Sequence, residues 1–409
     1  MRARTPLPRT VWALGLVSLC MDASSEIIHA LLPLFMTTTL GLSVATVGLI
    51  DGIAEATANI TKVFSGWLSD RSGRRKPLIL IGYGLAGLSK PLFPLASGAL
   101  PILGARFADR IGKGIRGAPR DALIADVTPE ALRGRAFGLR QSLDTAGAVI
   151  GPVMALALML LLAGDMRLVF WVAVIPAALA VLLVILGVED RANDEDAARA
   201  PLRWAELAGL DRGYWLVVAV AVAFSLARFS EAFLILKASE AGLPVALAPL
   251  VLIAMNLFYS AGAYPAGAVS DRVAPERLLF CGILLLVLGD LILAFGQGLA
   301  WVFVGTALWG AHLALTQGIL SRMIADRAPP RLRGSAFGLF NLATGLGLLG
   351  ASVAAGLLWD ALGSRFTFLA AAGCAAVAGF LLVAVGRARR SAAEAAGQQK
   401  APARRPGLH

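Results

Sequence analysis

Residues 123–139 read LIADVTPEALRGRAFGL, and residues 323–339 read MIADRAPPRLRGSAFGL, an offset of 200 positions. The shorter segment SDR at 69–71 recurs at 270–272, an offset of 201. Two matches at nearly one offset indicate that the second half of the chain is a copy of the first. A duplicated helical unit is typical of membrane transporters whose halves rock about a central site.

The composition is that of a membrane protein. Of the 409 residues, 58% are hydrophobic and only 15% are charged, which is too little polar surface for a soluble chain of this length. The net charge of +11 does not indicate nucleic-acid binding, because the basic residues cluster in short segments between apolar runs. We therefore expect a lipid bilayer, and no nucleic acid, among the partners.

The apolar runs predict about twelve spans, each near the roughly 20 residues that a helix needs to cross a bilayer. We place them near 11–40, 43–69, 77–97, 99–119, 134–163, 166–188, 213–237, 244–269, 276–296, 299–323, 334–360 and 364–386. The first run follows several arginines, as a signal peptide does, but it carries Asp22, Glu26 and His29 and leads into further spans. We therefore expect an uncleaved first helix.

The expected fold is an all-α membrane protein made of two pseudo-symmetric six-helix bundles, at 10–188 and 213–386. The polar segment 189–212 is predicted to link them on the cytoplasmic side. The segment 387–409 is rich in Ala, Gln and Arg and is predicted to be a disordered basic tail in the cytoplasm.

The charges of the connecting segments predict the topology. Lys and Arg gather in DRSGRRK (70–76), DRVAPER (271–277), RAPPRLRG (327–334) and the tail. The alternate connections TTTLGLS (37–43), ASGALP (96–101) and FGQGLA (295–300) carry no charge. Because positive segments stay inside, both termini should be cytoplasmic. We expect a multi-pass protein of the cell membrane, in a bacterium the inner membrane, that acts as a monomer.

The segment GWLSDRSGRR (66–75) between the second and third spans resembles the major facilitator superfamily. It fits that family's loop motif G-x-x-x-D-R-x-G-R-R at Gly66, Asp70, Arg71, Gly73, Arg74 and Arg75. The copy in the second half keeps Gly267, Asp271 and Arg272 but lacks the later glycine. The resemblance covers nearly the whole chain except the linker and the tail.

A second family motif lies in the fifth span. Gly138, Gly147, Gly151 and Pro152 fit G-x(8)-G-x(3)-G-P, the antiporter motif, although Ala155 and Leu156 replace its final two glycines. By this resemblance, export by exchange is favoured over uptake. Small residues also let helices approach closely, so packing alone would explain these positions.

Asp70 is predicted to act as a latch on the cytoplasmic side. It lies at a helix end beside a tight turn, where Gly73 can adopt a positive φ. A carboxylate there can cap a neighbouring helix N-terminus or pair with an arginine. Arg75 and Lys76 are expected to serve mostly the topology.

The fourth span carries an unusual charged stripe in RFADRIGKGIRGAPRD (106–121). Its charged side chains share one helical face: Arg106, Asp109, Arg110, Lys113, Arg116 and Arg120. With a rise of about 1.5 Å per residue, Arg106 lies roughly 10 Å deep and Arg110 near the midplane. Charges at that depth must face the bundle interior or water. Arg116 and Arg120 are expected at the inner rim.

Counter-charges lie on other spans. They are Asp22, Glu26 and His29 in the first, Asp51, Glu55 and Lys62 in the second, Lys90 in the third, Arg140 and Asp144 in the fifth, and Arg228 and Glu231 in the seventh. Two interpretations remain. Arg106, Arg110 and Lys113 pair with Glu26, Glu55 and Asp144 in a gating network, which we favour, while Asp109 neutralises part of their charge. Alternatively, they bind an anionic substrate directly.

Three functions compete. The first is a proton-coupled exporter (an antiporter) of a small solute, with Glu26 or Asp22 as the proton site and Glu231 next, since a carboxylate in a low-dielectric helix can load and release protons. The second is an importer or uniporter of an anionic solute held by Arg106, Arg110 and Lys113. The third is a sensor or an intramembrane enzyme.

An enzyme is not expected, because the sequence lacks an H-E-x-x-H motif and a nucleophile–base pair. A sensor usually needs an appended domain, and we see none. No metal or cofactor is expected, because only His29 and His312 lie within spans and the three cysteines are dispersed. The predicted partners are a small-molecule substrate and protons. Aromatic residues are 7% of the chain, which does not favour a large cavity for hydrophobic drugs.

Overall fold

The computed structural model describes residues 7–72, 74–189, 210, 212–270, 273–316, 319–325, 327–328 and 333–399. Within these residues the regular structure is entirely helical, which confirms the predicted all-α class. We call the side of the bundle on which the first helix begins the near side, and the opposite side the far side.

The first half alternates between the two sides through short connections. Its elements are α1 (Arg9–His29), α2 (Leu32–Leu34), the π-helix η1 (Phe35–Thr39), α3 (Val44–Ser72), α4 (Lys76–Ser89), α5 (Leu92–Leu95), α6 (Ala99–Val127), α7 (Glu130–Leu161) and α8 (Met166–Gly187). Two crossings are interrupted beside prolines, which lack a backbone donor. Pro33 follows the break between α1 and α2, and Pro91 follows Lys90 at the break between α4 and α5.

The second half repeats this plan. Its elements are α10 (Arg212–Ala227), α11 (Ala232–Glu240), the 3₁₀ helix η2 (Val245–Leu247), α12 (Pro249–Ser270), α13 (Pro275–Phe295), α14 (Leu299–Thr316), α15 (Ile319–Ala325), α16 (Arg333–Leu362) and α17 (Ser364–Gln399). Residues 228–231 between α10 and α11 are not helical. Irregular backbone at membrane depth is tolerated where it lines a cavity, and this break does so.

Ten helical segments of the described chain are long and apolar enough to cross a membrane. They confirm a multi-pass protein. The helices α3 and α6 do not qualify, although each has 29 residues, because charged side chains interrupt their apolar character. The expectation of twelve spans therefore stays a prediction at these two helices, and their charges build the site described below.

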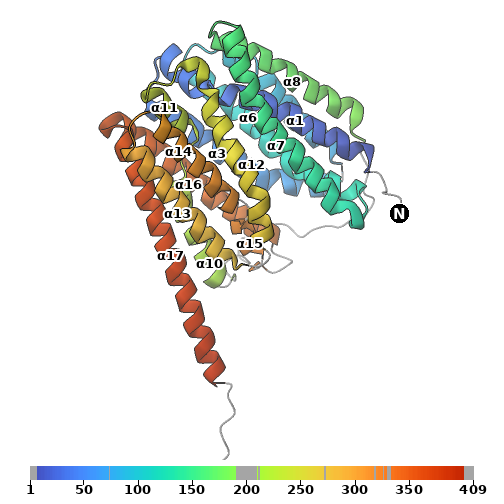
Figure 1. Ribbon diagram of the computed structural model, residues 1–409. Helices are drawn as coiled ribbons and strands as arrows, with labels where there is room; N and C mark the ends of the chain where they lie inside the picture. The colour runs from blue at the N-terminus through green and yellow to red at the C-terminus, as the bar shows by residue number, and fades with distance from the viewer. Residues whose placement is uncertain are drawn as a thin grey trace, which may run out of the picture.

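The two halves lie side by side, with α1, α6, α7 and α8 in one half and α10, α13, α14 and α17 in the other (Figure 1). They meet mainly where α3 packs on α16 and α7 packs on α12. Glycines let α3 and α16 approach closely. A Cβ added to Gly52 would lie 3.1 Å from the carbonyl oxygen of Leu349, and one added to Gly356 would lie 2.7 Å from that of Val44.

The last helix is longer than the sequence led us to expect. We predicted a tail without ordered structure from residue 387, whereas α17 continues through Gln399 and projects past its neighbours (Figure 1). The added stretch is rich in Ala, Arg and Gln, which are good helix formers. The linker residues 190–209 and 211 and the tail residues 400–409 lie outside the described part of the chain.

Candidate functional site

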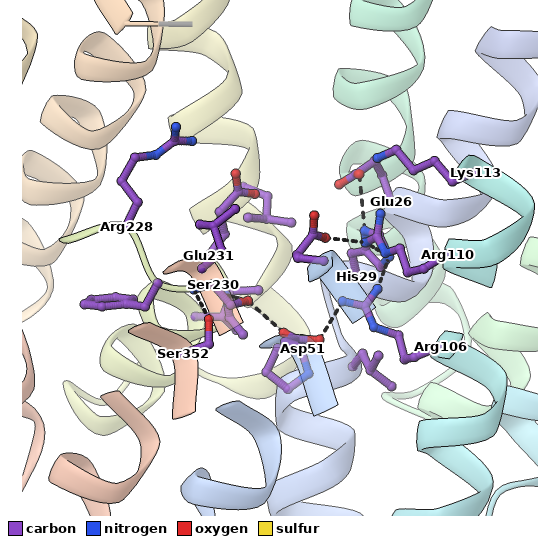
Figure 2. Close-up of a pocket in the computed structure, with 18 residues that line it drawn as sticks. Glu26, His29, Asp51, Arg106, Arg110, Lys113, Arg228, Ser230, Glu231 and Ser352 are labelled. Atoms are coloured by element: carbon purple, nitrogen blue, oxygen red, sulfur yellow. Dashed lines mark hydrogen bonds and ion pairs between the residues drawn. The ribbon is translucent and has the colours of Figure 1, made fainter. Parts of the chain in front are cut away.

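A cavity of about 320 Å³ lies between the two halves (Figure 2). Its charged and imidazole side chains are Glu26 and His29 of α1, Asp51 and Glu55 of α3, Arg106, Arg110 and Lys113 of α6, and Arg228 and Glu231 at the α10–α11 break. Four cations and four carboxylates thus share one small space. The stripe predicted on α6 does face the interior at Arg106, Arg110 and Lys113.

Asp51 joins the two halves at the floor of this cavity. Its Oδ1 lies 2.5 Å from Nη2 of Arg106, and both side chains are 5% exposed. Its Oδ2 accepts a hydrogen bond from the hydroxyl of Ser230 at 2.7 Å. The backbone N–H of Ser230 in turn donates to Oγ of Ser352 on α16 at 3.2 Å. An ion pair inside the first half is therefore hydrogen-bonded to the second half.

His29 lies between the arginines and Glu26 (Figure 2). Its Nε2 contacts Nη1 of Arg106 and lies 3.1 Å from Nη2 of Arg110. Its Nδ1 lies 3.3 Å from Oε1 of Glu26. Arg110 also pairs with Glu55 at 3.1 Å. The histidine therefore connects two ion pairs with a carboxylate that faces the cavity.

Asp109 has a partner that we did not predict. Besides lying among the cations of α6, it accepts a hydrogen bond from Nζ of Lys90 at 2.8 Å. Lys90 is 1% exposed and also donates to Oγ of Ser25 at 2.9 Å. The proline-associated break places Lys90 opposite Asp109, which a reading along α6 alone could not find.

Three charged side chains of the cavity form no ion pair within the described part of the chain. They are Lys113, Arg228 and Glu231. The guanidinium of Arg228 lies over the ring of Phe224, 5.7 Å from its centroid. Its Nε is buried and has no hydrogen-bond partner among the described residues. Lys113 and Arg228 lie on opposite sides of the cavity, one from each half (Figure 2). They are the cations available to a bound molecule.

A second cavity of about 560 Å³ extends toward the near side and shares Glu26, Glu55 and Lys113 with the first. Asp144 lines it and pairs with Arg140 at 2.9 Å, with Arg120 at 3.8 Å. Asp144 therefore pairs with Arg120 and Arg140 and, within the described residues, not with Arg106, Arg110 or Lys113 as expected.

Arg116 was expected at the inner rim but is buried. It lies 3.9 Å from Asp22 and over the ring of Tyr83 at 4.5 Å. Its side chain is 6% exposed and that of Arg120 is 12% exposed. The charged stripe of α6 therefore continues inside the bundle.

Two glycines of the antiporter motif pack α7 against the acidic face of α1. A Cβ on Gly147 would lie 3.0 Å from Cβ of Asp22, and one on Gly151 would lie 2.5 Å from Cβ of Glu26. A Cβ on Gly138 would meet no described residue within 4 Å. Pro152 lies inside α7 beside Gly151. The small residues thus allow the close helix contact that positions both carboxylates.

The loop motif is described only in part. Gly66, Asp70 and Arg71 lie on α3, but their side-chain surroundings fall outside the described part of the chain, as does Gly73. Arg75 pairs with Asp126 at 2.5 Å and donates to Oγ of Ser69 at 2.9 Å, so it also ties α6 to the end of α3. Arg74 precedes it as a described but exposed residue. The latch at Asp70 stays a prediction.

On the far side, a contact that we did not predict joins the halves. Asp360 at the end of α16 accepts hydrogen bonds from the backbone N–H groups of Val44 at 3.1 Å and Ala45 at 2.8 Å. A carboxylate at a helix N-terminus is stabilised by the unpaired N–H groups and the helix dipole. A sign of this contact was present in the sequence. Asp360 is an acidic residue at the end of an apolar span, and the neighbouring connections carry no charge.

Comparison with known proteins settles the family. A sequence profile of the Major Facilitator Superfamily matches residues 14–251 and 216–407. The chain belongs to the Major Facilitator Superfamily. It is 31% identical over 386 residues to an uncharacterized MFS-type transporter of Methanocaldococcus jannaschii, covering 92% of this chain and 95% of that one. As a member of this superfamily it is a transporter rather than an enzyme.

The chain also resembles a second transporter in sequence and a solved transporter structure in fold. Over 360 residues it is 27% identical to the multidrug resistance protein MdtH of Aeromonas hydrophila, covering 85% of this chain and 87% of that one. Its fold matches a bacterial homolog of the human lysosomal transporter Spinster, solved inward-facing and unoccupied, with a TM-score of 0.73. That match has 18% identity and covers 92% of this chain and 96% of the other, so it shows the fold alone.

Proposed function

We propose that this chain is a proton-coupled exporter that exchanges a small solute for protons by alternating access. The near side is cytoplasmic in this proposal, the membrane is the bacterial inner membrane, and the monomer is the working unit. The observation that carries it is the pair Glu26 and Glu231, which line one cavity from opposite halves without a lysine or arginine ion pair in the described chain. Carboxylates in such a place can take up and release a proton.

Exchange follows from the charges of the cavity. A proton on Glu26 removes one negative charge from a space that holds four carboxylates and four cations. A solute that needs that carboxylate, through a positive charge or a hydrogen-bond donor, therefore cannot bind together with the proton. Mutually exclusive binding of solute and proton is the condition for antiport.

The size and polarity of the cavity support a small polar solute. About 320 Å³ is near the lower end of ligand pockets, which span roughly 300–1,000 Å³ and are usually mostly apolar. Apolar side chains such as Phe229 and Leu252 form only part of this lining. The Aeromonas hydrophila relative is named a multidrug resistance protein, which supports export. The glycines of α7 match the antiporter motif, which is associated with export.

A second candidate function is proton-coupled uptake of an anionic solute. Lys113 and Arg228 favour it, because they face the cavity from the two halves without an ion pair within the described residues. The sign of the coupling is then reversed. A proton on Glu26 makes the cavity more positive and strengthens anion binding, so the anion and the proton would move together.

Reconstituted vesicles distinguish the two. A thermal-shift screen of charged and neutral metabolites on the purified protein first supplies a solute that binds. Export by exchange predicts that vesicles with an acidic lumen accumulate this solute from a neutral medium. Uptake with a proton predicts accumulation only when the medium is the acidic side. Accumulation that ignores the pH gradient would rule out proton coupling in either direction.

A further inference from the structure

The geometry points to His29 as the positioning residue that conveys the protonation state of Glu26 to the contact between the two halves at Asp51 and Ser230. This inference deepens the proposed function and rests on Glu26 as its proton site. It assigns to His29 neither the proton nor the solute. Its role is to hold Arg106 according to the charge on Glu26.

The contacts of His29 determine its tautomer. Nε2 contacts the guanidinium groups of Arg106 and Arg110, which have N–H donors and no acceptor. Nε2 must therefore carry the lone pair, and the ring proton lies on Nδ1. That N–H points to Oε1 of Glu26 at 3.3 Å. The imidazole is neutral, and it accepts from two arginines while donating to one carboxylate.

An unbroken series of contacts leads from Glu26 to the second half of the chain (Figure 2). Glu26 accepts from His29, His29 accepts from Arg106, and Arg106 donates to Oδ1 of Asp51 at 2.5 Å. Asp51 then accepts from Ser230 at 2.7 Å. The side chains of Arg106 and Asp51 are 5% exposed, so water does not screen this part of the series.

The charge on Glu26 changes how strongly His29 holds Arg106. Hydrogen bonds to an ionised group are roughly twice as strong as neutral ones, and bonds in series polarise one another. Ionised Glu26 makes Nε2 a better acceptor, which draws Arg106 toward His29 and away from Asp51. Protonated Glu26 weakens that pull, so Arg106 settles on Asp51 and fixes the carboxylate that accepts from Ser230. A protonated Glu26 thus favours contact between the halves.

Other charges surround this series and could respond to pH. They are Asp22 on α1, Glu55 on α3, Lys90 at the α4–α5 break, Arg110 and Lys113 on α6, and Arg228 and Glu231 at the α10–α11 break. Helix α7 presents Gly147 and Gly151 to this part of α1. A test must therefore interrupt the series at His29 and leave these groups in place.

Two substitutions interrupt the series of contacts at opposite ends of the His29 imidazole. His29→Gln places an amide oxygen near the former Nε2 and keeps an acceptor for the arginines, but it loses the Nδ1 donor to Glu26. His29→Asn keeps a donor near the former Nδ1 but loses the acceptor for Arg106. Ser230→Ala removes the last link from the other half. Thr57→Ala is the matched control, because within the described residues the Thr57 hydroxyl donates only to the carbonyl of Ile53 in its own helix.

The readout is the distance between spin labels at Leu100 and Leu362, two exposed far-side positions in opposite halves outside the series. The labels are attached to cysteines in the full chain, in a background without the native cysteines. Pulsed electron paramagnetic resonance then compares samples at about pH 5 and pH 8, because a carboxylate in a low-dielectric site can titrate between these values.

The wild type and Thr57→Ala should give a short distance at low pH and a longer population at high pH. His29→Gln and His29→Asn should lose this shift and stay short at both, while Ser230→Ala should stay long at both. A distance shift of wild-type size in either His29 variant would overturn the role of His29 and leave the proposed proton site at Glu26 standing. A wild type without any shift would overturn both this role and the proposed proton site.

Discussion

Ser230 donates a hydrogen bond to Asp51 across the boundary between the two halves of the chain, with Oγ 2.7 Å from Oδ2. Asp51 is buried and holds the guanidinium of Arg106 with its other oxygen. One carboxylate therefore has two tasks, neutralising a buried cation and joining the halves. Substitutions at the two ends of this bond should have different consequences.

Ser230→Ala should leave the protein folded and loosen the contact between the halves. A hydrogen bond to a charged group contributes about 1.5–3 kcal/mol, and here it acts only in the state in which the halves meet. Asp51→Asn should instead lower the melting temperature, because an unpaired buried arginine costs roughly 3–5 kcal/mol. Thermal unfolding in detergent checks both. Equal losses of stability in the two variants would contradict the separate tasks.

Asp360→Ala should favour opening of the far side. The substitution removes a cap worth about 0.5–2 kcal/mol that α16 supplies to α3 of the other half. Asp165→Ala is the matched control, since Asp165 caps α8 within one half through the N–H groups of Arg167 and Leu168. Labelling of a far-side cysteine by a water-soluble thiol reagent should accelerate in the first variant only. The same acceleration in both variants would show a general loss of stability.

Gly151→Ala should destabilise the packing of α7 on α1 at Glu26. The new Cβ would lie 2.5 Å from Cβ of Glu26 and 2.8 Å from the carbonyl oxygen of Ala23, and overpacking typically costs about 1–3 kcal/mol. Gly138→Ala in the same helix meets nothing within 4 Å and should be neutral or stabilising by up to about 1 kcal/mol. Melting temperatures in one detergent compare the two. If Gly138→Ala were the more damaging, the motif would act through something other than this contact.

Asp70→Asn should slow transport while the amount of folded protein in the membrane stays near that of the wild type. The predicted cause is a weaker closed state on the near side, because the capping carboxylate loses its charge. Initial transport rates, normalised to the purified protein in the vesicles, measure the effect. Transport at the wild-type rate would show that Asp70 is not a latch.

The sequence predicted the all-helical class and the interior position of Arg106, Arg110 and Lys113, because apolar length and helical periodicity are local properties. It placed Arg116 and Arg120 at the inner rim, whereas both are buried.

Of the expected pairings of Arg106, Arg110 and Lys113, the structure contains the one between Arg110 and Glu55. The partners of Asp109 and Asp51 were not predicted. Asp109 is bonded to Lys90, which the break between α4 and α5 places against α6. Asp51 is bonded to Ser230, which lies 179 positions away in the sequence. Such contacts need the relative rotation and depth of separate helices, which no spacing within one helix contains.

A hydrogen bond at corresponding positions occurs in both halves of the chain. Lys90 and Asp109 are hydrogen-bonded at 2.8 Å, and Asp290 and Trp309, each 200 positions later, are also bonded at 2.8 Å. The tie between the third and fourth crossings is thus kept with different chemistry. The positions that correspond to Arg106 and Arg110 are Thr306 and Gly310. The charged network therefore belongs to the first half, and the second half contributes the break at Arg228–Glu231.

Proton coupling through Glu26 is the centre of this account. Its most direct test is transport by Glu26→Gln in vesicles, measured once with a pH gradient and once as counterflow without one. Glu240→Gln is the control, because Glu240 is a half-exposed carboxylate outside both cavities that pairs with Lys237. We predict that Glu26→Gln loses gradient-driven transport and keeps counterflow, while Glu240→Gln keeps both. Gradient-driven transport at the wild-type rate in Glu26→Gln would contradict the account.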